Sequence, residues 1–177
     1  MTHTAAITRK NTRRKNDAYF TPTSAVDTLL NHIDITGTLL EPCNGSGAIS
    51  NRLKEDGLSV ITTDIADNPQ DDATTHQYWQ RQKPYDWVVT NPPFDSASKI
   101  LPKAYEYASV GVAFLLRLSY LEPCKDRGQW LAEHPPKLIV LPRISFTGDG
   151  KVDSCTCAWM IWKKGYSSED LIIVPKK

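Results

Sequence analysis

The sequence has no long hydrophobic run, and none of its apolar stretches approaches the roughly 18 residues of a membrane-spanning helix. Its N-terminus also lacks the apolar segment of a secretory signal peptide. We therefore expect no membrane association and a cytoplasmic location. With 177 residues, the chain is long enough for one domain with its own core and too short for two ordinary domains.

Cysteine is scarce, and the four cysteines form no Cys-x-x-Cys pair. Such pairs are the usual sequence sign of a structural zinc site. Cys155 and Cys157 are two positions apart, which in a strand would place both thiols on one face. We expect free thiols that fill the core, and no bound metal.

Acidic residues are absent before Asp17, whereas five basic residues lie between Arg9 and Lys15. The net charge of the whole chain is only +1, so this segment differs from the rest. Residues 1–17 therefore form a basic N-terminal arm, ahead of a single domain over residues 18–177. The arm is either a solvated, disordered tail or a phosphate-binding segment in which Arg13 and Arg14 contact a nucleic acid.

Strand and helix patterns alternate through the domain. Thr21 and Pro22 fit the N-cap and first position of a helix that ends near Asn31. Further helices are expected at 46–56, 97–108 and 125–133, and strands at 38–41, 59–63, 85–90, 110–116, 138–141 and 156–162. Residues 66–83 fit either a weak strand or a small helix. This alternation predicts an α/β fold with a mostly parallel sheet, helices on both faces and a terminal antiparallel hairpin.

The tetrapeptide Asn91-Pro92-Pro93-Phe94 directly follows the apolar run 87–90. Two consecutive prolines remove N–H donors and restrict the backbone, so the turn is stiff. The Asn91 side-chain oxygen and the Pro92 carbonyl can then accept the two hydrogens of an exocyclic NH2 group, and Phe94 can cover the attached ring. The tetrapeptide therefore predicts a binding site for a flat group that carries an amine.

A glycine-rich turn, Glu41-Pro42-Cys43-Asn44-Gly45-Ser46-Gly47, follows the first expected strand and opens a helix. Glycines at Gly45 and Gly47 let the backbone approach a ligand closely. Asp64 ends the next expected strand, where a carboxylate can hydrogen-bond ribose hydroxyls. Both features belong to the carboxyl edge of the sheet, where open α/β sheets bind ligands.

These segments resemble motifs of one enzyme family. Asn91–Phe94 resembles motif IV of the S-adenosylmethionine-dependent amino-methyltransferases, while Glu41–Gly47 and Asp64 resemble motifs I and II. The family methylates N6 of adenine, the exocyclic amine of guanine or a glutamine amide. The resemblance implies a Rossmann-like class I methyltransferase fold with a seven-stranded sheet, and S-adenosylmethionine as the cofactor.

Further residues are assigned by position within the same resemblance. Asp72 matches motif III, where a carboxylate accepts from the cofactor's adenine; the alternative is a surface aspartate beside Asp71. Tyr19 and Thr21 match motif X, which covers the methionine end of the cofactor; the alternative is an ordinary helix cap. The implied cofactor-binding set is Tyr19, Thr21, Glu41, Pro42, Asn44, Gly45, Gly47, Asp64, Asp72 and Asn91.

The implied target-binding residues lie on three segments. Tyr120 matches motif VI, or it is packing. Phe146 matches motif VIII, where an aromatic ring covers the second face of the target base, or it anchors its loop to the core. Arg143 and Lys151 in the same loop are expected to contact phosphates, together with the arm.

The motif order resembles that of the gamma class of DNA N6-adenine methyltransferases. The leading hypothesis is therefore methyl transfer to adenine N6 in DNA, with RNA adenine or guanine as the alternative. A protein glutamine methyltransferase and a non-catalytic nucleic-acid-binding module fit less well. The sequence shows no separate target-recognition domain, so recognition would come from short loops, a partner subunit or a homodimer.

Overall fold

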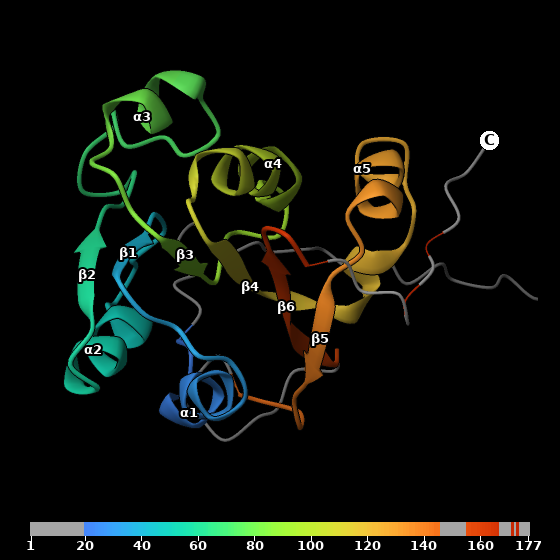
Figure 1. Ribbon diagram of the computed structural model, residues 1–177, viewed down its shortest axis with the longest axis horizontal. Helices are drawn as coiled ribbons and strands as arrows, with labels where there is room; N and C mark the ends of the chain where they lie inside the picture. Colours follow the sequence, from blue (N-terminus) through green and yellow to red (C-terminus); the bar gives the residue numbers. More distant parts are fainter. Residues whose placement is uncertain (1–19, 146–154, 167–170, 172, 174–177) are drawn as a thin grey trace, which may run out of the picture.

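The structure is a computed structural model, and it describes residues 20–145, 155–166, 171 and 173. The described residues fold into one sheet with helices on both sides (Figure 1). In chain order, the elements are α1 Thr23–His32, β1 Thr38–Glu41, α2 Ala48–Glu55, β2 Ser59–Thr62, α3 His76–Arg81, β3 Trp87–Thr90, α4 Ala97–Tyr107, β4 Gly111–Arg117, the 3-10 turn η1 Leu118–Leu121, α5 Gly128–Glu133, β5 Lys137–Val140 and β6 Cys157–Lys163.

The six strands lie in the order β2-β1-β3-β4-β6-β5. Strands β2, β1, β3 and β4 are parallel, whereas β6 runs antiparallel to both of its neighbours, β4 and β5. The expected antiparallel hairpin is therefore confirmed. The expected count of seven strands is wrong for the described residues, because residues 66–83 contribute the helix α3 instead of a strand.

Adjacent residues of each strand point into two separate cores. On one face, Leu40, Val88 and Phe114 join side chains of α3, α4 and α5. On the other face, Leu39 and Val89 join side chains of α1 and α2. Figure 1 shows these two groups of helices on opposite sides of the sheet. A sheet covered on both faces needs apolar residues at every position of its central strands, which explains the unbroken apolar runs of β3 and β4.

Helix α1 is tied to the last strand. The indole nitrogen of Trp159 donates to the Ala25 carbonyl over 2.7 Å, and both residues are buried. The helix begins at Thr23 with Pro22 as its N-cap, so Thr21 does not cap it as expected. No helix among the described residues is long and apolar enough to cross a membrane.

The edge of the sheet where β1, β3 and β4 begin is held by Asp86. Its two carboxylate oxygens accept from the Thr38 N–H and the Ser109 hydroxyl, each over 2.8 Å, and these bonds lower the pKa of Asp86. Gly37 lies against the same carboxylate with a φ of +85°. A Cβ on Gly37 would lie 2.0 Å from Asp86 Oδ2, so this position requires glycine for two reasons.

Candidate active site

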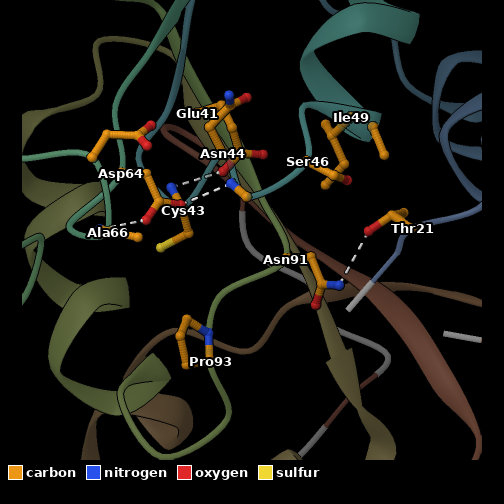
Figure 2. Close-up of a pocket in the computed structure, with 13 residues that line it drawn as sticks. Thr21, Glu41, Cys43, Asn44, Ser46, Ile49, Asp64, Ala66, Asn91 and Pro93 are labelled. Carbon is orange, nitrogen blue, oxygen red and sulfur yellow. Dashed lines mark hydrogen bonds between the residues drawn. The ribbon is translucent and has the colours of Figure 1, made fainter. Parts of the chain in front are cut away.

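A pocket of about 360 Å³ opens at the carboxyl ends of β1, β2 and β3 (Figure 2). This is the edge at which open parallel sheets bind ligands, and the volume suits a small molecule. Seven of the predicted site residues line it: Thr21, Glu41, Asn44, Gly45, Asp64, Asn91 and Pro93. The sequence motifs therefore meet at one place although they are far apart along the chain.

The glycine turn forms one wall of the pocket. Gly45 and Gly47 have φ values of +49° and +78°, which residues with a Cβ rarely adopt. Asn44 fixes the turn from inside, because its carbonyl accepts from the Gly47 N–H over 2.8 Å and its side-chain oxygen accepts from the Ser50 hydroxyl over 2.6 Å. The turn is thereby closed before any ligand binds.

Asp64 links the glycine turn to the end of β2. Its Oδ2 atom accepts from the Gly45 N–H over 2.7 Å, and its Oδ1 atom accepts from the Ala66 N–H over 2.8 Å. Each carboxylate oxygen has a second lone pair that remains for another donor. Asp64 therefore fixes the local backbone and still presents acceptors to the pocket.

Glu41 is a buried acid at the floor of the pocket, with 1% of its surface exposed. Its Oε1 atom accepts from the Cys43 N–H over 3.0 Å and from the Thr90 hydroxyl. Its Oε2 atom is buried and has no hydrogen-bond partner among the described residues. Burial raises the pKa of Glu41 to about 8, with a further contribution from the charge of Asp64. A cationic ligand group would supply the partner that Oε2 lacks.

Asn91 lies at the end of β3 with its side chain turned toward Thr21 (Figure 2). Its Nδ2 atom donates to the Thr21 hydroxyl oxygen over 3.1 Å, and Thr21 is only 2% exposed. In this arrangement the amide nitrogen faces Thr21. The Asn91 side-chain oxygen has no donor among the described residues and is left as an acceptor beside the pocket.

The carbonyl groups of Pro92 and Pro93 differ in the hydrogen bonds that they accept. The Pro93 carbonyl accepts from the N–H groups of Ser96 and Ala97, each over 3.0 Å, and this bonding starts the approach to α4. No donor among the described residues reaches the Pro92 carbonyl. Two acceptors on adjacent residues, Asn91 Oδ1 and the Pro92 carbonyl, therefore have no donor among the described residues, although Pro92 is buried and does not itself line the pocket.

Phe94 and Tyr120 do not line the pocket. Phe94 is half-buried, packs against the core on the α4 side and carries the Arg117 guanidinium over its ring, with Cζ 4.4 Å from the ring centre. Tyr120 is 8% exposed, and burial raises its pKa. The Arg127 guanidinium covers the Tyr120 ring at 4.9 Å. Tyr120 thus sits in a packed environment, next to the pocket rather than in it.

Other predicted residues lie outside the pocket. Asp72 accepts through Oδ1 from the N–H and hydroxyl of Thr74, and these bonds lower its pKa. Arg143 is exposed just beyond β5, which runs parallel to β4, so it belongs to the same edge of the sheet as Asn91. Pro42 and Gly47 belong to the glycine turn but do not line the pocket. The remaining predictions, Tyr19, Arg13, Arg14, Phe146 and Lys151, lie outside the described residues, as does the arm over residues 1–17.

The pocket also contains residues that the sequence did not single out: Cys43, Ser46, Ala48, Ile49, Ala66 and Asp67. Cys43, Ser46 and Ala48 adjoin a predicted residue along the chain, and Ala66 and Asp67 follow Asp64 within three positions, which is the signal that could have found them. Ile49 comes from the first turn of α2, where helical spacing from the glycine turn would have indicated it. Burial and the nearby Glu41 carboxyl raise the pKa of Cys43, so its thiol stays protonated.

No protein-family model matches the sequence, and no curated protein matches it. Solved structures do match the fold. A dimethyladenosine transferase from Plasmodium falciparum superposes with a TM-score of 0.57 at 12% identity. The Type I restriction enzyme EcoKI M protein superposes with a TM-score of 0.58 at 14% identity, and the 23S rRNA methyltransferase ErmE superposes with a TM-score of 0.54 at 13% identity. These likenesses show that the chain has the class I S-adenosylmethionine-dependent methyltransferase fold.

The likenesses cover most of this chain and only part of the others. The match with the Plasmodium enzyme covers 81% of this chain and 62% of that enzyme. The match with the EcoKI M protein covers 86% of this chain and 45% of that protein, and the match with ErmE covers 81% of this chain and 68% of ErmE.

Proposed function

We propose that the protein transfers a methyl group from S-adenosylmethionine to the exocyclic N6 amine of adenine in DNA. One observation carries this proposal: Asn91, which lines the pocket, keeps its side-chain oxygen as an unused acceptor, and the Pro92 carbonyl on the next residue also has no donor among the described residues. An exocyclic NH2 group has two hydrogens, and this pair of acceptors matches it.

The residues around the pocket fit S-adenosylmethionine in three places. The glycine turn allows close backbone approach, and Asp64 presents carboxylate oxygens suited to ribose hydroxyls. Glu41 Oε2 is a buried acceptor without a partner among the described residues, which suits the ammonium of the methionine end. When bound there, S-adenosylmethionine supplies a methyl group on a sulfonium, which is reactive toward a nitrogen lone pair.

The chain's own residues would act by positioning. The adenine amine is a weak nucleophile because its lone pair is delocalised into the ring. Hydrogen bonds from its two N–H groups to Asn91 Oδ1 and the Pro92 carbonyl favour a pyramidal nitrogen and stabilise the positive charge that develops on it. Thr21 holds the Asn91 amide in the required orientation, so much of the orientational cost is met before the base arrives.

A base inside a duplex cannot reach such a pocket, so the target must be flipped out or unpaired. Phe94 next to the acceptors is the proposed stacking surface, and Arg143 at the same edge is a proposed phosphate contact. Phe146, Lys151, Arg13 and Arg14 remain predictions for the same role. RNA is the second candidate substrate, because the neighbours in fold include an enzyme named as a 23S rRNA methyltransferase and the Asn91–Pro92 acceptors suit the same chemistry.

The experiment is a transfer assay with S-adenosylmethionine tritiated on its methyl group. The full chain is incubated in parallel with unmethylated duplex DNA, single-stranded DNA, total RNA and a protein extract, and the modified residue is identified by mass spectrometry. We expect N6-methyladenine in DNA. Label confined to RNA would move the substrate to the second candidate, and label in glutamine would replace the nucleic-acid proposal.

Asn91→Ala is the matched control for the chemistry. It removes one of the two acceptors while leaving the glycine turn, Glu41 and Asp64 in place. We expect it to retain cofactor affinity and to lose turnover. Wild-type turnover in this variant would contradict the proposed mechanism.

A further inference from the structure

Arg117 places a positive charge on the proposed stacking residue. It is the last residue of β4, and its guanidinium carbon lies 4.4 Å from the centre of the Phe94 ring. Strands β3 and β4 are parallel neighbours, so Arg117 and the Asn91–Phe94 segment belong to the same edge of the sheet. A planar cation therefore covers the ring that would receive the target base.

A base that stacks on Phe94 needs an open face of its ring. Phe94 packs against the core cluster on the α4 side, and the guanidinium lies over its ring. Guanidinium groups stack on aromatic rings much as a flat heterocycle does. In the free protein, Arg117 thus holds the place of the base, and a base can stack on Phe94 only after the guanidinium has moved.

Charge favours the same movement. The proposed reaction builds positive charge on the amine that Asn91 and Pro92 hold, and a guanidinium left against the base would oppose it through a short, poorly screened Coulomb interaction. Each nucleotide brings an anionic phosphate with its base, and guanidinium binds phosphate through two parallel hydrogen bonds. The phosphate therefore offers Arg117 a new partner at the moment when the base displaces it.

We propose that Arg117 is a target-positioning residue that exchanges the Phe94 ring for the backbone phosphate of the nucleotide being methylated. The inference rests on the proposed function, since it takes a flipped nucleotide as the ligand. It adds a role for a residue that the sequence motifs did not indicate, and it couples base entry to phosphate binding through a single side chain.

Arg127 provides a matched comparison. Its guanidinium also covers an aromatic ring, that of Tyr120, at 4.9 Å. Arg127 donates from Nε to the Tyr120 carbonyl over 2.7 Å and from Nη2 to the Ser119 carbonyl over 3.4 Å. Arg127→Ala removes the same charge and the same kind of stack without removing the proposed phosphate contact.

The test uses the full chain as wild type, Arg117→Ala, Arg117→Lys and Arg127→Ala. Binding of a fluorescein-labelled, adenine-containing oligonucleotide is followed by anisotropy at a series of NaCl concentrations. The kcat and KM for methyl transfer and the cofactor Kd are measured on the same preparations. Arg117→Gln keeps most of the side chain without its charge, and it replaces Arg117→Ala if that variant does not fold.

For Arg117→Ala we expect the KM for nucleic acid to rise about 10-fold, the size of one lost charge-assisted contact. The slope of log affinity against log salt should fall by about 0.9 for duplex DNA or about 0.7 for a single strand, the value of one phosphate contact. The kcat and cofactor Kd should stay at their wild-type values. Arg117→Lys should keep the slope, and Arg127→Ala should keep both the slope and the KM.

Two results would overturn this inference while leaving the proposed function in place. In the first, the wild type is active, and Arg117→Ala has the wild-type KM and the wild-type slope of log affinity against log salt. In the second, Arg117→Ala loses kcat while that slope is unchanged. The first would make Arg117 a structural cover for Phe94, and the second would make it part of the chemistry. A wild type that neither binds nor methylates nucleic acid would overturn the proposed function, and this inference with it.

Discussion

The side-chain nitrogen of Asn91 donates a hydrogen bond to the hydroxyl oxygen of Thr21 over 3.1 Å, across 70 positions of the sequence. Thr21 lies ahead of α1, on a segment that crosses the carboxyl end of β3. In this arrangement the nitrogen of the Asn91 amide is engaged and its oxygen is available to a ligand. Thr21, on the segment before α1, thus contributes to the orientation of the Asn91 amide, the proposed catalytic group.

Replacing Thr21 by valine tests this relationship. Valine has nearly the same shape as threonine and cannot hydrogen-bond the amide, so the Asn91 side chain gains a second orientation. We expect kcat to fall about 2- to 10-fold, the worth of one neutral hydrogen bond, with little change in the cofactor Kd. Steady-state kinetics and a cofactor titration measure the two effects separately.

Thr28→Val is the control, because Thr28 lies on α1 and its hydroxyl donates to the Ser24 carbonyl of the same helix. It should have wild-type kinetics. Equal losses in the two variants would mean that a change anywhere near α1 slows the reaction, and the orienting role of Thr21 would be lost.

Asp64→Ala removes the acceptor of the Gly45 and Ala66 N–H groups and the proposed ribose acceptor together. We expect the cofactor Kd to rise about 10- to 100-fold, because each hydrogen bond to a charged group contributes about 1.5–3 kcal/mol. The kcat at saturating cofactor should change far less. Isothermal titration with S-adenosylhomocysteine measures the affinity, and an unchanged Kd would remove Asp64 from the cofactor site.

Glu41 predicts a pH-dependent stability. Its pKa rises from 4.5 to about 8 on folding, so between these values the folded state holds a proton that the unfolded state has lost. The free energy of unfolding therefore falls as pH rises through this window. Glu41→Gln mimics the protonated acid, so its free energy of unfolding should lack this pH dependence. Above about pH 8 the variant should be more stable than the wild type by a few kcal/mol, since a shift of one pKa unit corresponds to about 1.4 kcal/mol.

Urea unfolding of both proteins between about pH 5 and pH 9 measures the difference. Glu55→Gln is the control, since Glu55 is an exposed residue at the end of α2. Parallel pH profiles for the wild type and Glu41→Gln would show that Glu41 is ionised in the folded protein.

Gly37 and Gly57 form a matched pair for stability. Both have strongly positive φ, +85° and +83°, but only at Gly37 would a Cβ meet another side chain, the Asp86 carboxylate. Gly57→Ala should cost about 1 kcal/mol from backbone strain alone. Gly37→Ala should cost at least about 1 kcal/mol more, because Asp86 must shift and weaken its bond to Thr38. Thermal or urea unfolding compares them, and equal costs would show that Asp86 adapts freely.

The sequence predicted the elements well where their patterns were strong. The strand β1 was predicted at its observed bounds, and β3, β4 and β6 were predicted within two residues, because apolar runs bounded by turn residues are unambiguous. The choice between a strand and a helix for residues 66–83, which contain α3, was left open because these residues are polar and show little hydrophobic periodicity. The two buried aromatics of α3, Tyr78 and Trp79, became informative only once the sheet gave them a surface to pack on.

The candidate site was predictable in its chemistry and not in its contacts. Asn91, Gly45 and Asp64 could be assigned because each follows a strand, and parallel strands bring their ends together. The hydrogen bond between Thr21 and Asn91 could not be predicted, because Thr21 already fitted a helix cap and nothing in the local sequence favours a partner 70 positions away. Arg117 was missed for a similar reason, since an arginine at a strand end has no sequence signal that points to Phe94.

The place of β6 in the sheet has a consequence for biosynthesis. This strand is the last of those that the structure describes, yet it lies between β4 and β5, and its Trp159 donates to the Ala25 carbonyl of α1. While a ribosome is still making it, β4 is complete but has an unpaired edge of apolar residues. Such an edge is a template for pairing with other chains. A nascent chain of this protein is therefore exposed to aggregation until β6 emerges, and a premature stop upstream of Cys157 would leave that edge open permanently.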